Sequence, residues 1–149
     1  MYHGISNVYS ICTLNGQELP IMQISSPTVA AGFPSPAADY MEDEIDFNHL
    51  LRPRPASTFV VRVQGDSMIE ANIPSNALLI VDRSVKPVSG NIVVAVVNSE
   101  FTVKRLIKNS SGIRLMPANP KYNPIPVTEG MDFAVWGTVT QIIIDALKQ

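Results

Sequence analysis

The chain is poor in the residue types that would mark several common classes of protein. Its 149 residues include one cysteine, Cys12, which excludes an internal disulfide framework and a cysteine-based zinc site. The single thiol also fits a reducing compartment such as the cytoplasm. The two histidines, His3 and His49, both lie outside strand-like segments, so neither is a strong candidate for a catalytic base. No resident metal or cofactor is expected.

Basic charge and long apolar runs are scarce as well. The net charge is −2, and the basic clusters are no longer than Lys104-Arg105 and Arg52-Pro53-Arg54. The sequence therefore predicts no general attraction to nucleic acid and no sequence-specific DNA binding. No apolar run reaches the roughly 18 residues of a membrane helix. The first residues also lack the charged start and apolar region of a secretory signal. We expect a cytoplasmic protein without membrane contact.

What the chain does contain is a series of short apolar segments after residue 58. With 46% hydrophobic and 16% charged residues, its composition is that of a folded domain. Short apolar runs separated by turn residues predict a mostly β fold, barrel-like or a sandwich. The expected strands cover residues 59–63, 77–81, 92–97, 101–106, 113–116 and 133–144, with a turn at Asn98-Ser99, a proline-rich irregular crossing after 116 and a bend at Gly137.

The first third of the chain has a different pattern. Residues 1–31 show no convincing core element, apart from a short strand at 21–24, and are interpreted as an extended, detachable arm. Residues 37–51 have apolar positions at helical spacing, with an acidic opposite face and a break near Asp43 that would divide them into two short helices.

The segment Gln64-Gly65-Asp66-Ser67-Met68-Ile69 is the first candidate for chemistry. It follows a predicted strand, and its glycine places Ser67 on a tight turn. A serine there exposes its hydroxyl as a nucleophile, and the backbone N–H groups of Ser67 and Met68 can stabilise an oxyanion. The simpler alternative is that Ser67 or Asp66 caps a turn that begins at Met68.

Lys104 is the candidate base for this serine. Strand alternation places Thr102, Lys104 and Leu106 on one face of the segment 101–106. A lysine in apolar surroundings loses proton affinity and can then accept the Ser67 proton near neutral pH. The alternative is a lysine whose side chain extends to solvent, as most strand lysines do. The residues alone leave both alternatives open.

Several stretches together resemble the LexA/UmuD family of self-cleaving peptidases with a Ser-Lys dyad. The peptidase motifs are Gly65-Asp66-Ser67-Met68 and the segment Glu100–Leu106, with Ser67 and Lys104 37 residues apart. Segments typical of the UmuD branch are Ala31–Tyr40, Leu78–Asp82 and Val135-Trp136-Gly137. The resemblance covers residues 29 to about 144. It implies a compact β-clip domain, preceded by an arm and one or two short helices.

The resemblance also implies a substrate, which is the chain itself. The matching bond is Ala31-Gly32, although the best-known member of the UmuD branch has cysteine at the position of Ala31. Ser67 would attack this bond with Lys104 as base. The cut would separate an arm, residues 1–31, from a peptidase domain, residues 32–149.

The implied partners belong to the response to DNA damage. A RecA filament on single-stranded DNA would trigger the cut, and the shortened product would act as a homodimeric accessory subunit of a UmuC-type Y-family DNA polymerase. About 30 residues precede the bond, too few for the winged helix-turn-helix of a LexA-type repressor. Three alternatives stay open: an interaction module that is never cut, a LexA-like regulator without its DNA-binding domain, and a signal-peptidase-like enzyme that cuts other proteins.

Overall fold

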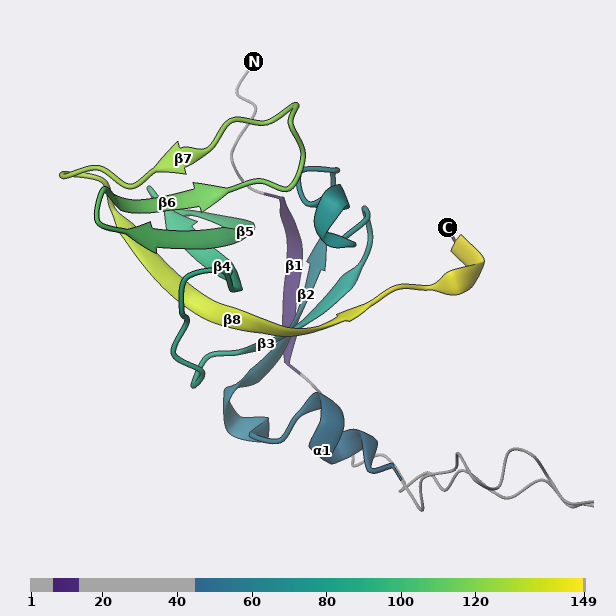
Figure 1. Ribbon diagram of the computed structural model, residues 1–149. Helices are drawn as coiled ribbons and strands as arrows, with labels where there is room; N and C mark the ends of the chain where they lie inside the picture. The colour runs from purple at the N-terminus through teal and green to yellow at the C-terminus, as the bar shows by residue number, and fades with distance from the viewer. Residues whose placement is uncertain (1–6, 14–44, 149) are drawn as a thin grey trace, which may run out of the picture. The chain divides into compact units, whose positions relative to one another are not determined.

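The computed structural model describes residues 7–13 and 45–148, which divide between two units (Figure 1). One unit comprises Met1–Leu14 and Arg54–Gln149, and the other comprises Asn15–Pro53. The described part of the second unit contains helix α1 (Phe47–Leu51). Asp46 caps this helix, because its carboxylate accepts hydrogen bonds from the N–H groups of Asn48 and His49 at 2.9 and 3.4 Å. The predicted helical residues 37–44 and the predicted strand at 21–24 lie outside the described residues.

The first unit is a single antiparallel sheet with strand order β1-β2-β3-β8-β4-β5-β6-β7. The mostly β prediction is therefore confirmed. The strands are β1 (Val8–Thr13), β2 (Thr58–Val63), β3 (Leu78–Asp82), β4 (Ile92–Val97), β5 (Glu100–Asn109), β6 (Gly112–Met116), β7 (Ile125–Pro126) and β8 (Phe133–Ile143). Single 3-10 turns lie at Pro55–Ser57, Ile69–Ala71 and Ala146–Lys148.

The six strands expected from apolar runs are all present, within a few residues of their predicted ends. Two strands were missed. Strand β7 has two residues within the proline-rich crossing, too few to give a periodic pattern. Strand β1 pairs antiparallel with β2 at the edge of the sheet. The expectation that the first residues contain no core element is therefore wrong for Val8–Thr13. Tyr9 is 66% exposed, so only part of this strand contributes apolar burial.

Strand β8 connects the two halves of the sheet by pairing with both β3 and β4. Its pairing with β4 shifts register between Val94 and Ala95, opposite the segment that contains Gly137. A Cβ atom at Gly137 would lie 2.5 Å from Cγ1 of Val81. The predicted bend at this glycine thus coincides with a close approach of β3, which requires a residue without a side chain.

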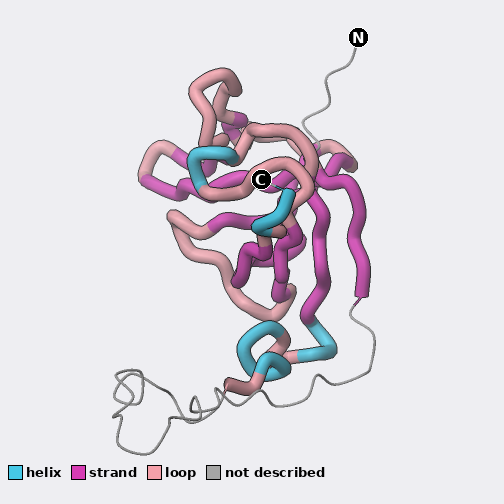
Figure 2. The backbone as a smooth tube through the Cα atoms, turned by 90° about the vertical axis from the view of Figure 1, so that its right-hand side faces the viewer, coloured by secondary structure: helices cyan, strands magenta, loops and turns pink. Residues whose placement is uncertain are grey.

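The sheet curls instead of lying flat, and in Figure 2 its strands cross at steep angles. One apolar core lies around Val61, Leu79 and Val103, and a second lies around Val93 and Leu115. The curl brings the start of β1 to β5, although these strands are five places apart in the sheet order. This approach of β1 to β5 builds the site described next.

Candidate active site

Ser67 lies in the turn that follows β2. Gly65 adopts a φ of +84° there, a conformation that favours glycine, and its N–H donates to Ser75 Oγ at 3.0 Å. Ser67 is 5% exposed, and the side chain of Met68 next to it is packed in the core. Neither Ser67 nor Asp66 caps the following 3-10 turn, which has Met68 at its N-cap and no side-chain cap bond. The capping alternative is therefore excluded.

A second loop, after β6, holds the serine turn in place. The N–H of Ala118 donates to the Ser67 carbonyl at 2.8 Å. The Asn119 side chain donates to the Asp66 carbonyl at 2.9 Å, and the Tyr122 hydroxyl donates to the Asp66 carboxylate at 2.5 Å. Sequence reasoning treated this stretch only as an irregular crossing. Its hydrogen bonds reach across more than fifty residues, so no local pattern indicated them.

Lys104 reaches Ser67 from β5. Its Nζ lies 3.2 Å from Ser67 Oγ, 2.8 Å from Thr102 Oγ1 and 3.0 Å from the Val103 carbonyl oxygen. The lysine is only 4% exposed, so its side chain does not extend to solvent. Burial lowers the pKa of Lys104 from 10.5 to about 8, because the charged form is poorly solvated there. The predicted shared face of Thr102 and Lys104 is confirmed by their contact.

Asn7, immediately before β1, completes the polar cluster. Its Nδ2 lies 3.0 Å from Ser67 Oγ, and its Oδ1 accepts from the Val103 N–H at 2.6 Å. Strand β6 pairs with β5 only from Arg105 onward, so the edge of β5 at Val103 is not covered by β6. The Asn7 amide bonds to this part of the edge. Sequence reasoning missed Asn7, since a lone asparagine far from the serine motif carries no signal.

The turn also presents backbone donors. The N–H groups of Ser67 and Met68 make no hydrogen bond to any part of the chain that the structure describes. Their role as oxyanion donors stays a prediction. Among residues 7–13 and 45–148, no group of three or more histidine, cysteine, aspartate or glutamate side chains is placed to hold a metal ion. No helix within these ranges is long and apolar enough to cross a membrane.

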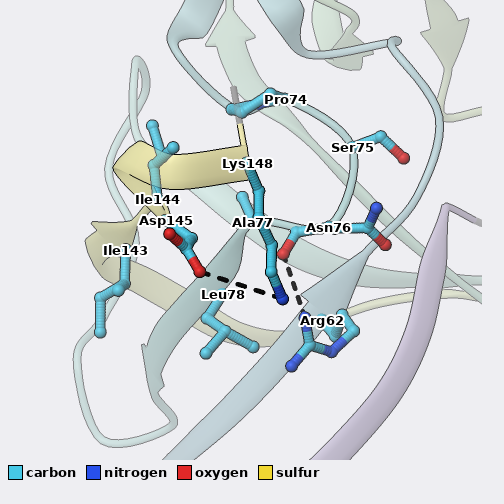
Figure 3. Close-up of a pocket in the computed structure, with 10 residues that line it drawn as sticks. All are labelled: Arg62, Pro74, Ser75, Asn76, Ala77, Leu78, Ile143, Ile144, Asp145 and Lys148. Atoms are coloured by element: carbon cyan, nitrogen blue, oxygen red, sulfur yellow. Dashed lines mark hydrogen bonds and ion pairs between the residues drawn. The ribbon is translucent and has the colours of Figure 1, made fainter.

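A separate pocket of about 620 Å³ lies near the C-terminal end of β8 (Figure 3). Among the residues that line it, Arg62 Nη1 donates to the Asn76 carbonyl at 3.2 Å, and Lys148 Nζ lies 3.9 Å from the Asp145 carboxylate. Neither Ser67 nor Lys104 lines this pocket. It is not part of the serine site.

Comparison with known proteins identifies the family of this chain. The family model described as Peptidase S24-like matches residues 20–140. The chain belongs to the peptidase S24-like family. The matched range contains both Ser67 and Lys104 but begins after Asn7 and β1.

Three named proteins are similar to this chain over most of its length. Protein SamA of Salmonella typhimurium is 48% identical over 113 residues, which are 76% of this chain and 78% of SamA. Protein ImpA of Escherichia coli is 38% identical over 132 residues, 87% of this chain and 88% of ImpA. The LexA repressor of Bordetella avium is 37% identical over 115 residues, 77% of this chain but 54% of the repressor.

The structure thus brings together the predicted site residues that it describes. Ser67, Met68 and Lys104 form one site in the first unit. His49 lies on α1 in the other unit, and His3 lies outside the described residues. The predicted bond Ala31-Gly32 also lies outside them, so its position relative to Ser67 stays a prediction.

Proposed function

We propose that this S24-like chain is a self-cleaving serine peptidase in which Ser67 attacks the Ala31-Gly32 bond and Lys104 acts as the base. The observation that carries the proposal is the 3.2 Å contact between Ser67 Oγ and Lys104 Nζ at a buried position. A serine hydroxyl alone is a weak nucleophile and needs a positioned base within hydrogen-bond reach. At neutral pH a lysine provides one only if its pKa is lowered, as burial does here.

The proposed reaction uses Lys104 and Ser67 in turn. The neutral Lys104 amine takes the Ser67 proton while Oγ attacks the carbonyl carbon of Ala31. The oxyanion that forms accepts hydrogen bonds from the Ser67 and Met68 N–H groups. As the C–N bond breaks, the Lys104 ammonium returns its proton to the departing nitrogen of Gly32, and residues up to Ala31 remain as an ester on Ser67. Water then hydrolyses the ester and regenerates the serine.

The proposed reaction is one cut for each chain without repeated turnover. A bond tethered to the same chain reacts at a rate set by how often it occupies the site, so no affinity for a free substrate is needed. With a pKa of about 8, roughly a tenth of the Lys104 side chains are neutral at pH 7. A slow basal reaction that a partner can accelerate fits these properties.

The proposed role is in the response to DNA damage. The UmuD-like motifs and the similarity to Proteins SamA and ImpA support a function in SOS mutagenesis. We propose that a RecA filament on single-stranded DNA stimulates the cut. The product, residues 32–149, would then serve as a dimeric accessory subunit of a UmuC-type translesion polymerase in the cytoplasm. Similarity to a LexA repressor supports the same damage signal.

Incubation of the purified chain tests the peptidase. The chain is held with activated RecA filaments, or alone at alkaline pH, and its fragments are weighed by mass spectrometry. We expect two fragments, one that ends at Ala31 and one that begins at Gly32. A Ser67→Ala variant should give neither fragment. A chain that stays intact under both conditions would favour an interaction module that is never cut. Fragments that end elsewhere would refute the assigned bond.

A further inference from the structure

The Asn7 side chain forms several hydrogen bonds with residues of the serine site. Its Nδ2 donates to Ser67 Oγ at 3.0 Å and approaches the Val103 carbonyl oxygen at 3.4 Å. Its Oδ1 accepts from the Val103 N–H at 2.6 Å and from the Thr102 hydroxyl at 3.3 Å. Its own carbonyl accepts from the Gln64 N–H at 3.0 Å. The residue is buried, and it lies outside the range matched by the family model.

These partners leave one orientation for the asparagine amide. The Val103 N–H can only donate, so the amide atom that faces it must be the oxygen. The Asn7 nitrogen is therefore the atom that faces Ser67, and Ser67 Oγ accepts a hydrogen bond from it. A serine hydroxyl has a single hydrogen. When Lys104 is neutral and Asn7 is a donor, that hydrogen is left for Lys104 Nζ, which lies 3.2 Å from Oγ.

The neighbours of Lys104 Nζ fix the directions of the N–H groups of the neutral amine. The Thr102 hydroxyl donates to Asn7 Oδ1, so its oxygen is free to accept an N–H from Nζ at 2.8 Å. The Val103 carbonyl oxygen accepts the second N–H at 3.0 Å. A neutral amine has two N–H groups and one lone pair. Both N–H groups are then used, and the lone pair is directed at Ser67.

We infer that Asn7 is a positioning residue of this site, whose side-chain amide directs the Ser67 hydroxyl toward Lys104. The amide oxygen also accepts the Thr102 hydroxyl hydrogen, so that this hydrogen is not donated to the lone pair of Lys104 Nζ. The inference rests on the proposed function, because it assigns Asn7 a role in that reaction. Asn7 acts through other side chains and is not itself the nucleophile or base. Since it precedes Ala31 in the chain, one cut leaves it joined to Ser67 only by noncovalent contacts.

Two variants of Asn7 separate positioning from a merely structural role. Asn7→Ala removes the donor to Ser67. We expect self-cleavage to slow about 10- to 100-fold, because misplacement of a reacting group has an effect of this size.

Asn7→Asp keeps the acceptor for Val103 but adds a negative charge beside Lys104. In the unchanged chain, burial is the only cause of the lowered Lys104 pKa. The polar side chains that face Nζ are Ser67 and Thr102, and neither is charged. The pH dependence of cleavage should therefore move to higher pH in Asn7→Asp.

The rates are measured on the full chain from pH 6 to pH 10, with thermal melting to verify folding. Tyr9→Ala is the matched control, because Tyr9 is 66% exposed and lies on β1, the strand that begins directly after Asn7. We expect a wild-type rate in this control. An unchanged rate in Asn7→Ala would overturn the inference. So would a faster rate, which would mean that Asn7 blocks the site and does not order it.

A second measurement does not depend on cleavage. In the Ser67→Ala background, NMR titration of Lys104 compares Asn7 with Asn7→Asp, and a rise in the Lys104 pKa is expected in the aspartate variant. If the wild-type chain is never cut while this rise is seen, the proposed peptidase fails but Asn7 still belongs to the lysine environment. If no rise is seen, Asn7 is not part of the site and the inference is wrong, whatever the cleavage result.

Discussion

Ser67 Oγ lies 3.2 Å from Lys104 Nζ, although the two residues are 37 positions apart and their side chains come from opposite halves of the curled sheet. Ser67 follows β2, whereas Lys104 is on β5, and three strands lie between β2 and β5 in the sheet order. The contact therefore depends on the curl of the sheet and on loops anchored far from either residue.

The first prediction concerns the pH dependence of self-cleavage. Lys104 must be neutral to accept a proton, and its pKa in the folded chain is about 8. The rate should therefore rise about tenfold from pH 6 to pH 7 and level off above pH 8. Gel densitometry of the intact chain over time at each pH measures this. A rate that is flat between pH 6 and pH 8 would show that Lys104 is not the base.

The second prediction concerns stability and is made in a Ser67→Ala background so that cleavage does not interfere. The folded state binds the Lys104 proton more weakly than the unfolded state, whose pKa is near 10.5. Between about pH 8 and pH 10.5 the unfolded state carries more protons, so the free energy of unfolding rises with pH. Below pH 8 the buried charge destabilises the fold by up to about 3 kcal/mol.

Lys104→Met is the variant that tests this, because it keeps the side-chain length without the charge. We expect it to be more stable than its parent at pH 7, and the difference to shrink as the pH approaches 10.5. Lost hydrogen bonds to Thr102 and Val103 reduce the gain by about 1 kcal/mol each. Urea unfolding at several pH values gives the comparison. A difference that does not vary with pH would contradict the lowered pKa.

The third prediction concerns the loop that holds the serine turn. The hydrogen bond from Tyr122 is the main cause that lowers the pKa of Asp66, and the same contact raises the pKa of Tyr122. Tyr122→Phe should let the Asp66 pKa return toward 3.8 and should slow cleavage without unfolding the chain. NMR titration of Asp66 and the cleavage rate are the two measurements. Glu129→Ala, at an exposed site after β7, serves as the comparison and should leave the rate unchanged.

The fourth prediction concerns the bend of β8. Because a Cβ at Gly137 would lie 2.5 Å from Val81 Cγ1, Gly137→Ala should destabilise the domain by about 1–3 kcal/mol. Adding Val81→Ala removes the clashing methyl group. In the double variant the cost of Gly137→Ala should largely disappear, and thermal denaturation of all four proteins measures this coupling. Strictly additive effects would mean that no clash occurs at this position.

The sequence by itself determined the local features of the fold. Runs such as Ile92–Val97 are apolar and mostly β-branched over the length of a strand, so their secondary structure follows from their own residues. The turn at Asn98-Ser99 was likewise predictable, and both residues have positive φ in the structure. Motif resemblance identified Ser67 and Lys104, because the residues around each of them form a recognisable short segment.

Only the tertiary structure decided which distant groups complete the site. Asn7 lies 60 residues from Ser67 and 96 from Val103 in the chain, and it reaches both because β1 pairs at the edge of a curled sheet. Backbone pairing of an edge strand leaves almost no trace in sequence, since any residue can provide its N–H and carbonyl groups. The same holds for the loop bonds to Asp66 and for the burial that lowers the Lys104 pKa. Hydrogen-bond geometry and burial are properties of the whole fold, whereas strand propensity is a property of a few neighbouring residues.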